Sequence, residues 1–196
     1  MSLKKITEPT AESVKHYLRV WDELENYRLQ ESALDHLFFE LCPNNSDIRC
    51  ILLKVSTLND FYSTNIFSVY PVAKHILSLN IDRRLRDGDE TLVDEIKEIT
   101  IGGKKRNLYS FATKYCSHHN PLAFPIYDSY VDKVLKYFRD RDHFYEFRSS
   151  DLKNYGQFIC MLISFREYYG LKDYSLKDID KFLWLFGKEF FPRSYG

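Results

Sequence analysis

The sequence predicts an all-α fold of about nine helices, in one domain that spans residues 1–196. Apolar residues recur at the helical spacing along most of the chain, and no convincing run of alternating strand residues interrupts them. Glycine and proline are scarce, at 7 and 6 residues, which favours long helices over a loop-rich sandwich. The hydrophobic content of 44%, with 15 tyrosines and 15 phenylalanines, is ample for a packed core.

The first half of the chain carries the signals of four helices. Thr10 follows Pro9 at the expected start of the first helix, and Pro43 follows the expected end of the second. The first helix is expected to begin near residue 10, and the second to cover residues 30–42. The third is expected to begin after Asn45 or Ser46, and the fourth to cover residues 69–79. Residues 82–89 are predicted to be a charged connector, with Gly88 as its breaker.

The second half continues the same periodicity. Further helices are expected over residues 91–99 and 105–117, after Asp128, from residues 150–151 to Gly170, and from Ser175 onward. Gly102 and Gly103 separate the first two of these, and residues 139–149 form a polar connector. Ser175 and Asp178 match the capping-box pattern that opens a helix.

Charge and cysteine content limit the classes of function. Lys plus Arg and Asp plus Glu both number 28, so no global basic field attracts nucleic acid or anionic membrane. Any such binding needs a local basic patch. The four cysteines form no C-x-x-C pair and no targeting peptide precedes them, which predicts reduced thiols and a cytoplasmic protein. No apolar run is long enough to cross a bilayer, so no membrane partner is expected.

Asp128 is the most informative candidate residue. Pro125 restricts the backbone that precedes Asp128, and an amphipathic stripe follows Asp128 at Val131, Val134 and Leu135. Asp128 is therefore expected at the N-cap of a helix, where backbone N–H groups and the helix dipole favour a carboxylate. This position is typical of simple capping, and equally of a carboxylate that is kept ionised in an active site.

The segment around Asp128 resembles the catalytic core of the helix-hairpin-helix DNA glycosylase superfamily. The matching residues are Pro125, Ile126, Asp128, Val131, Val134 and Leu135, with Lys133 where an arginine is usual. The resemblance covers about residues 48–188 and implies a two-lobed helical fold, with Asp128 as the catalytic carboxylate. It also relates the helix that ends near Asn59 to an early helix whose polar end enters the DNA, which makes Asn59 a candidate DNA contact.

The same resemblance places Ser110 where bifunctional glycosylases carry a Schiff-base lysine. A serine there fits a monofunctional enzyme, or a protein without activity. Lys114 lies one helical turn further and is expected to share a face with Ser110, where it could substitute for the missing lysine. No four-cysteine motif is present, so no iron–sulfur cluster and no other cofactor is expected.

Two basic clusters are candidates for phosphate contact. The first follows Gly102 and Gly103, where the superfamily has a Gly-x-Gly hairpin, and consists of Lys104, Lys105 and Arg106. The second consists of Arg83, Arg84 and Arg86 and is diluted by neighbouring aspartates. Each can equally be a solvated helix end or loop.

Cys116, His118 and His119 are residue types that bind zinc, but no further ligands stand at matching spacing, so no metal site is predicted. The leading hypothesis is a DNA-binding protein of glycosylase descent that contacts duplex DNA through a local basic patch, with a monofunctional base-excision activity at Asp128. The rivals are a non-catalytic helical interaction module and a small-molecule pocket between the lobes. The sequence leaves the oligomeric state open.

Overall fold

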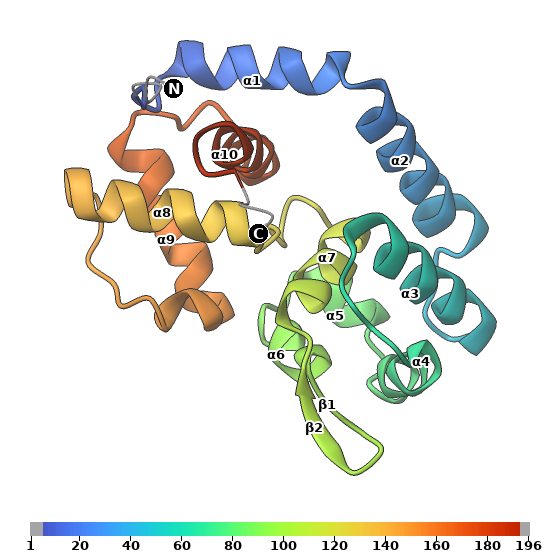
Figure 1. Ribbon diagram of the computed structural model, residues 1–196. Coiled ribbons are helices and arrows are strands. Elements are labelled where there is room, and N and C mark those ends of the chain that lie inside the picture. Colours follow the sequence, from blue (N-terminus) through green and yellow to red (C-terminus); the bar gives the residue numbers. More distant parts are fainter. Residues whose placement is uncertain (1–5, 193–196) are drawn as a thin grey trace. The chain divides into compact units, whose positions relative to one another are not determined.

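The computed structural model describes residues 6–192, which form ten α-helices, one π-helix, one 3₁₀ helix and a two-stranded sheet (Figure 1). The predicted all-α class is confirmed, apart from the small sheet. The chain divides into two compact units, and each is described by itself. Unit 1 combines the N-terminal residues up to Glu25 with the chain from Tyr127 onward, and unit 2 is Asn26–Ile126. No helix within residues 6–192 has the length and apolar character needed to span a membrane.

Unit 1 contains four α-helices and the 3₁₀ helix. They are α1 (Ala11–Glu23), α8 (Ser129–Asp142), η2 (Asp151–Lys153), α9 (Tyr155–Tyr168) and α10 (Leu176–Phe190). The two capping boxes explain where α1 and α10 begin. Thr10 accepts a hydrogen bond from the backbone N–H of Ser13, and Ser175 does the same from Asp178, as the sequence predicts for the last helix.

The core of unit 1 forms where α10 packs against α8 and α1. The predicted stripe of α8 is fully buried, and it meets the apolar faces of α9 and α10. The buried residues of these helices include Val131, Val134, Leu135, Phe138, Phe158, Leu162, Phe165, Ile179, Phe182 and Phe186. Gly187 of α10 lets α8 approach closely, because a Cβ atom there would lie only 2.7 Å from Cβ of Tyr130.

Unit 2 contains the remaining elements. They are α2 (Glu25–Asp35), the π-helix η1 (His36–Leu41), α3 (Ile48–Tyr62), α4 (Val69–Ser78), α5 (Asp82–Asp87), α6 (Thr91–Lys97), β1 (Glu98–Ile101), β2 (Lys104–Asn107) and α7 (Tyr109–His119). Helix α7 is the centre of this unit, because it packs against α3, α5, α6 and η1. Its residues from Tyr109 to Ser117 are almost all buried.

The strands β1 and β2 correct the prediction that residues 91–99 and 105–117 are helices divided by two glycines. Helix α6 ends at Lys97, and the chain then forms an antiparallel hairpin before α7 begins at Tyr109. The backbone N–H of Leu108 donates to the carbonyl of Lys97 at 2.7 Å and closes the base of this hairpin. The alternation of Ile99 and Ile101 beside a Gly-Gly pair is a hairpin signal that helical periodicity obscured.

Other boundaries also differ from the predictions. Asp47, and not Asn45 or Ser46, caps α3, and α8 continues to Asp142, into the predicted connector over residues 139–149. The predicted helix over residues 30–42 is an α-helix that continues as the π-helix η1, in which the N–H of Cys42 bonds to the carbonyl of Leu37. The predicted charged connector contains the short helix α5, which Gly88 ends in a left-handed conformation. Ser150 and Asp151 open only the 3₁₀ helix, and Asn154 caps the long helix α9.

Candidate functional site

The β1–β2 hairpin presents the predicted basic cluster. Ile101 pairs with Lys104 across a two-residue turn of Gly102 and Gly103. Both glycines have positive φ, at 56° and 75°, which is the backbone of a type I′ hairpin turn. The turn therefore depends on glycine, and it directs β2 back along β1 as a two-stranded ribbon.

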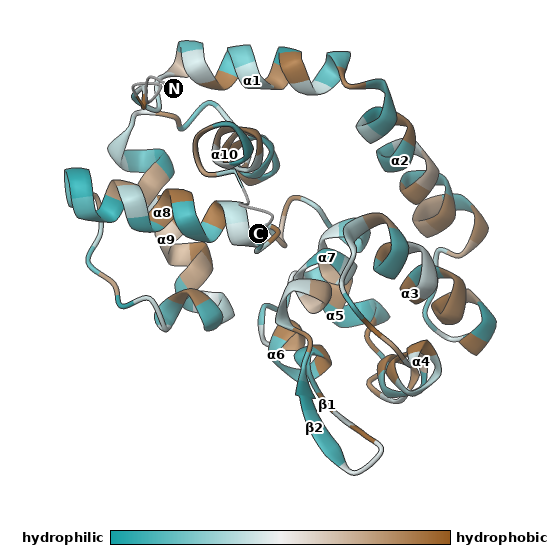
Figure 2. Cartoon of the chain, viewed as in Figure 1, coloured by the Kyte–Doolittle hydropathy of each residue, from teal (hydrophilic) through white to brown (hydrophobic). Residues whose placement is uncertain are grey.

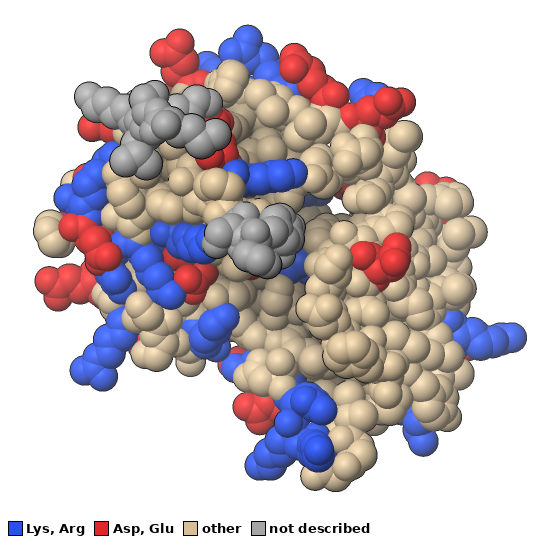
Figure 3. All heavy atoms as spheres, in the orientation of Figure 1, with Lys and Arg blue, Asp and Glu red and all other residues tan. Residues whose placement is uncertain are grey.

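All four residues of β2 are exposed. Figure 3 shows Lys and Arg side chains gathered over the hairpin at the lower end of the view, and Figure 2 shows β2 as hydrophilic along its length. Cross-strand partners share a face of a ribbon and neighbours along a strand alternate, so Lys104 and Arg106 lie on one face and Lys105 on the other. Within residues 6–192, none of these three side chains takes part in an ion pair.

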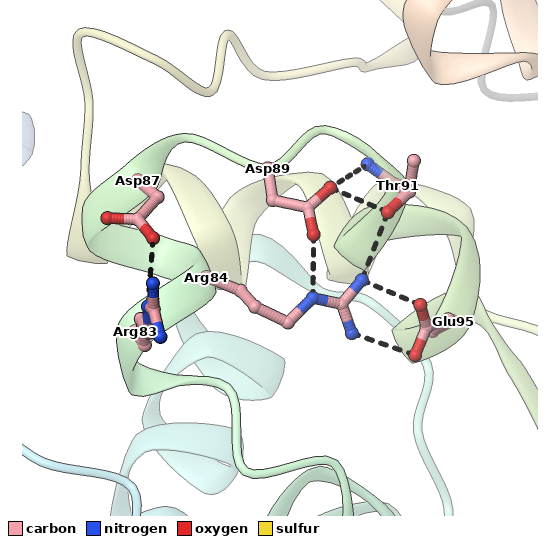
Figure 4. Close-up of polar contacts among 6 residues, drawn as sticks. All are labelled: Arg83, Arg84, Asp87, Asp89, Thr91 and Glu95. Carbon is pink, nitrogen blue, oxygen red and sulfur yellow. Dashed lines mark hydrogen bonds and ion pairs between the residues drawn. The ribbon is translucent and has the colours of Figure 1, made fainter.

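The second basic cluster has a different environment. Arg84 is enclosed by Asp89, Thr91 and Glu95, to which its guanidinium donates four hydrogen bonds of 2.6 to 3.0 Å (Figure 4). These bonds hold the pKa of Arg84 above its usual range, with Glu95 as the largest cause. Arg83 pairs with Asp87 at 3.4 Å. The charges of Arg83 and Arg84 are therefore balanced inside unit 2, whereas those of the hairpin face solvent.

Asp128 caps α8, as the sequence predicts. Its Oδ1 accepts hydrogen bonds from the backbone N–H of Tyr130 at 2.8 Å and of Val131 at 2.9 Å. The residue has the extended backbone of an N-cap and is half-buried. A carboxylate in this position is stabilised by two N–H donors and by the positive end of the helix dipole. Asp128 belongs to unit 1.

Ser110 and Lys114 belong to unit 2, where the structure brings them together on α7. Nζ of Lys114 donates to Oγ of Ser110 at 2.6 Å and to the carbonyl of Ser110 at 3.3 Å. The predicted shared face is thus confirmed. The Lys114 side chain is almost fully buried, and its ammonium lies 5.2 Å from the ring centroid of Tyr62. Nζ of Lys114 is therefore engaged by Ser110 and lies beside an aromatic ring inside unit 2.

Asn59 uses its side chain inside the loop that joins α3 to α4. Its Oδ1 accepts from the N–H of Ile66 at 2.8 Å and from the hydroxyl of Thr64 at 2.9 Å. Its Nδ2 donates to the carbonyl of Ile66 at 3.0 Å. These bonds stabilise a loop in which Ser63 and Asn65 have positive φ. A DNA contact through Asn59 stays a prediction, and the observed geometry gives this residue a loop-forming role.

A buried polar network centred on Lys54 is the largest feature that the sequence analysis missed. Lys54 is fully buried, and its Nζ donates to Oδ1 of Asn45 at 2.7 Å and to the carbonyl of Asn44 at 3.1 Å. The third neighbour is Nε2 of His119, at 3.3 Å. The three donors of the ammonium therefore meet three acceptors, as a buried cation requires.

Asn45 joins the remaining members of the network. Its Oδ1 also accepts from the Tyr115 hydroxyl at 2.6 Å, and its Nδ2 donates to Oδ1 of Asp82 at 2.6 Å and lies 3.2 Å from Nε2 of His119. Burial and the nearby Lys54 cation lower the pKa of His119 well below its usual value. His119 is thus a neutral acceptor at Nε2, with its proton on Nδ1.

A signal for this network was present in the sequence. Lys54 lies among Ile51, Val55 and Leu58 on the apolar stripe of α3, where a solvated lysine is not expected. The two histidines have separate contacts: His119 contacts Lys54 in the network, and Nε2 of His118 lies 2.9 Å from the Tyr62 hydroxyl. Over residues 6–192, no group of three or more His, Cys, Asp or Glu side chains is arranged to hold a metal ion.

These features define a mostly helical protein whose second unit carries an exposed basic β-hairpin and, in its core, a buried polar network centred on Lys54. The chain belongs to the HI_0787_N family, an N-terminal domain whose model matches residues 13–123. An uncharacterized protein of Haemophilus influenzae (strain Rd) is 53% identical over 148 residues, which cover 75% of this chain and 71% of that protein. No solved structure matches the chain. The region matched by the family model, residues 13–123, contains the hairpin and the Lys54 network and ends before Asp128.

Proposed function

We propose that this protein binds duplex DNA through the β1–β2 hairpin. The observation that carries the proposal is the exposure of Lys104, Lys105 and Arg106 on both faces of one ribbon, without an ion pair inside the described chain. Duplex DNA carries a dense line of phosphate charge, and lysine and arginine are residues that contact those phosphates. A two-stranded ribbon is also narrow enough to enter a DNA groove.

The first experiment measures binding of the full chain to a fluorescent duplex by anisotropy, at several salt concentrations. Each phosphate contact contributes about 0.9 to the slope of log affinity against log salt. The triple variant Lys104→Ala, Lys105→Ala, Arg106→Ala is expected to bind at least tenfold more weakly at low salt, with a slope that is smaller by up to about three.

The matched control is the triple variant Arg28→Ala, Arg49→Ala, Lys74→Ala, which removes the same charge from exposed positions of unit 2 outside both basic clusters. It is expected to retain most of the affinity, because the hairpin remains intact. Absence of binding by the parent at low salt would overturn the proposal, and so would an equal loss in both triple variants.

The resemblance around Asp128 extends the proposal to a monofunctional N-glycosylase. Cleavage of an N-glycosidic bond develops positive charge on the sugar. An ionised carboxylate can stabilise this charge, or it can orient the attacking water. Two backbone N–H groups donate to Oδ1 of Asp128 and hold its carboxyl group at the start of α8. A monofunctional mechanism needs no Schiff base, so a serine at position 110 is compatible with it.

The test is a single-turnover assay on duplexes that carry damaged or mismatched bases, with the parent and Asp128→Asn. Asparagine keeps the capping oxygen and removes the charge, so the variant is expected to stay folded and to lose excision. Excision at the parental rate would exclude Asp128 from the mechanism.

A non-catalytic helical interaction module is the second candidate, and it is favoured by the engagement of Asp128 as an ordinary helix cap. This candidate predicts DNA or protein binding without excision of any base. We also propose a cytoplasmic location, in agreement with four cysteines that are free thiols; cell fractionation tests it.

A further inference from the structure

Phe67 is the most exposed large apolar side chain within residues 6–192. It lies in the loop that joins α3 to α4, and 98% of its side chain is exposed. Phenylalanine is among the residues that proteins bury most often, so an almost fully exposed ring is an unusual feature of this surface. A contact that removes such a ring from water is favourable, which makes Phe67 a candidate for binding a partner.

The loop that carries Phe67 is held in one conformation. Both backbone polar groups of Ile66 are hydrogen-bonded to the side chain of Asn59, at 2.8 and 3.0 Å. The Ile66 side chain is buried, and the hydroxyl of Thr64 donates to Asn59 as well. Phe67 then precedes Ser68, the N-cap of α4. The ring is therefore presented from a fixed backbone, so little loop entropy is lost when a ligand covers it.

A second exposed ring follows in the first turn of α4. Tyr70 is 56% exposed, and Nζ of Lys74 lies 5.8 Å from the centroid of its ring. Exposed aromatic rings with a nearby cation are typical of surfaces that bind single-stranded nucleic acid, because every base has a π-face on which a ring can stack. Tyr70 comes shortly after Phe67 in the chain, so one flexible strand can reach both rings.

The chain around these rings lacks acidic residues. No Asp or Glu occurs between Asp60 and Asp82, nor between Glu98 and Asp128, although the chain has 28 acidic residues. The first segment contains both rings, and the second contains the basic cluster of the hairpin. The two segments are neighbours in unit 2, because α4 packs against β1 and α3 packs against α7. A DNA phosphate near the rings therefore meets no carboxylate of either segment, which favours an anionic partner over an uncharged one.

We propose that Phe67 and Tyr70 stack on unpaired bases of DNA, so that the preferred ligand is a duplex with a single-stranded gap. This ligand preference rests on the proposed contact of the hairpin with DNA and adds a second contact to it. In an intact duplex the faces of the bases are covered by their neighbours, whereas a base in a gap offers its face to a ring. Phenylalanine has no polar atom that reads the edge of a base, so the stacking tolerates any sequence.

The experiment compares two fluorescent DNAs by anisotropy, a blunt duplex and the same duplex with a short single-stranded gap. The parent full chain is expected to bind the gapped DNA at least about fivefold more tightly. Phe67→Ala is expected to lose most of this preference and to keep the parental affinity for the blunt duplex. The exposure of the ring means that its removal leaves the fold intact. 2-Aminopurine placed in the gap reports the stacking directly, because its fluorescence is expected to be quenched by the parent and not by Phe67→Ala.

Phe39→Ala is the matched control, because Phe39 is another exposed phenylalanine of unit 2 and lies outside the two segments without acidic residues. This variant is expected to keep both affinities. The triple variant Lys104→Ala, Lys105→Ala, Arg106→Ala is expected to bind both DNAs more weakly while it keeps the ratio between them. The two variants thus separate the contact of the rings from the contact of the hairpin.

Equal affinity of the parent for the two DNAs, or a preference that Phe67→Ala retains, would overturn the stacking and leave the hairpin contact standing. In the first case, self-association of the parent that Phe67→Ala abolishes would assign the ring to a contact between protein copies. Binding of gapped DNA that depends on Phe67 and not on the hairpin would overturn the hairpin contact alone. Binding of neither DNA would overturn both.

Discussion

Lys54 donates a hydrogen bond of 2.7 Å to Oδ1 of Asn45, and no part of this contact reaches solvent. The rings of Phe38 and Tyr115 also lie near the ammonium, with centroids 5.4 and 5.9 Å from Nζ. A buried cation is tolerated only when its donors are satisfied, and Asn45 and its neighbours satisfy them. The stability of unit 2 is thereby linked to the protonation of one lysine.

The first prediction concerns the pH dependence of stability. Burial lowers the pKa of Lys54 from 10.5 to about 8, against the attraction of Asp82. Between these values the unfolded chain binds more protons than the folded one, so Lys54 contributes stability that rises with pH. From pH 7 to 9.5 the free energy of unfolding of the parent, relative to Lys54→Met, is expected to rise by about 2 kcal/mol.

Urea denaturation of both proteins across this range measures the difference. Taking the difference removes the contributions of other groups, such as the buried tyrosines, that are common to the two proteins. A difference that does not change with pH would contradict the inferred burial of a charged Lys54.

The second prediction concerns the cap of α8. Asp128→Ala removes the acceptor of the Tyr130 and Val131 N–H groups and is expected to lower the free energy of unfolding by about 1 kcal/mol. Asp128→Asn keeps a capping oxygen and is expected to change it by a few tenths of a kcal/mol at most. Urea denaturation of the three proteins checks this. Equal losses in both variants would show that the negative charge, and not the capping bond, stabilises this helix start.

The third prediction concerns the close approach of α10 to α8. A methyl group at Gly187 would lie 2.7 Å from Cβ and 3.0 Å from the backbone oxygen of Tyr130. Because backbone cannot move aside as a flexible side chain can, Gly187→Ala is expected to destabilise the protein by about 1–3 kcal/mol. Thermal unfolding measures the effect. The neighbouring exposed variant Lys188→Ala is expected to stay within about 0.5 kcal/mol of the parent, and a stabilised Gly187→Ala would refute the packing.

The fourth prediction concerns the turn of the hairpin. Gly103→Ala places a side chain at a φ of 75° and is expected to destabilise the hairpin by about 1–2 kcal/mol. Gly102→Asn is expected to be tolerated, because asparagine followed by glycine is the preferred pair in a type I′ turn. Amide hydrogen exchange over residues 98–107 reads the result without reference to DNA. Unchanged protection in Gly103→Ala would contradict the turn.

The helical spacing of apolar residues predicts the helices that bury one face and expose the other. The stripes of α3, α8 and α10 were identified from their apolar spacing, and the starts at Thr10 and Ser175 from their capping residues. The position of Asp128 followed from local rules alone, because a proline and a following stripe define a helix start. The shared face of Ser110 and Lys114 likewise required only the geometry of one helix.

The features that were missed depend on contacts between distant segments. The side chain of Asn45 is hydrogen-bonded to Asp82 and Tyr115, which lie 37 and 70 residues further along the chain. No local pattern specifies such partners, so Lys54 was overlooked although it stands on an apolar stripe. The hairpin was missed for a different reason: four-residue strands are too short to outweigh the helical periodicity on either side.

The hydrogen bond between Leu108 and Lys97 has a consequence for how this domain can vary. Because this bond closes the base of the hairpin, residues 98–107 leave the chain between α6 and α7 and return to it at one place. Strand β1 packs against α4 and α6 through the buried Ile99, whereas all four residues of β2 are exposed, so the charge and side chains of β2 can change while the helices keep their packing. Relatives can thus diverge in what they contact at this point while they retain the same helical body.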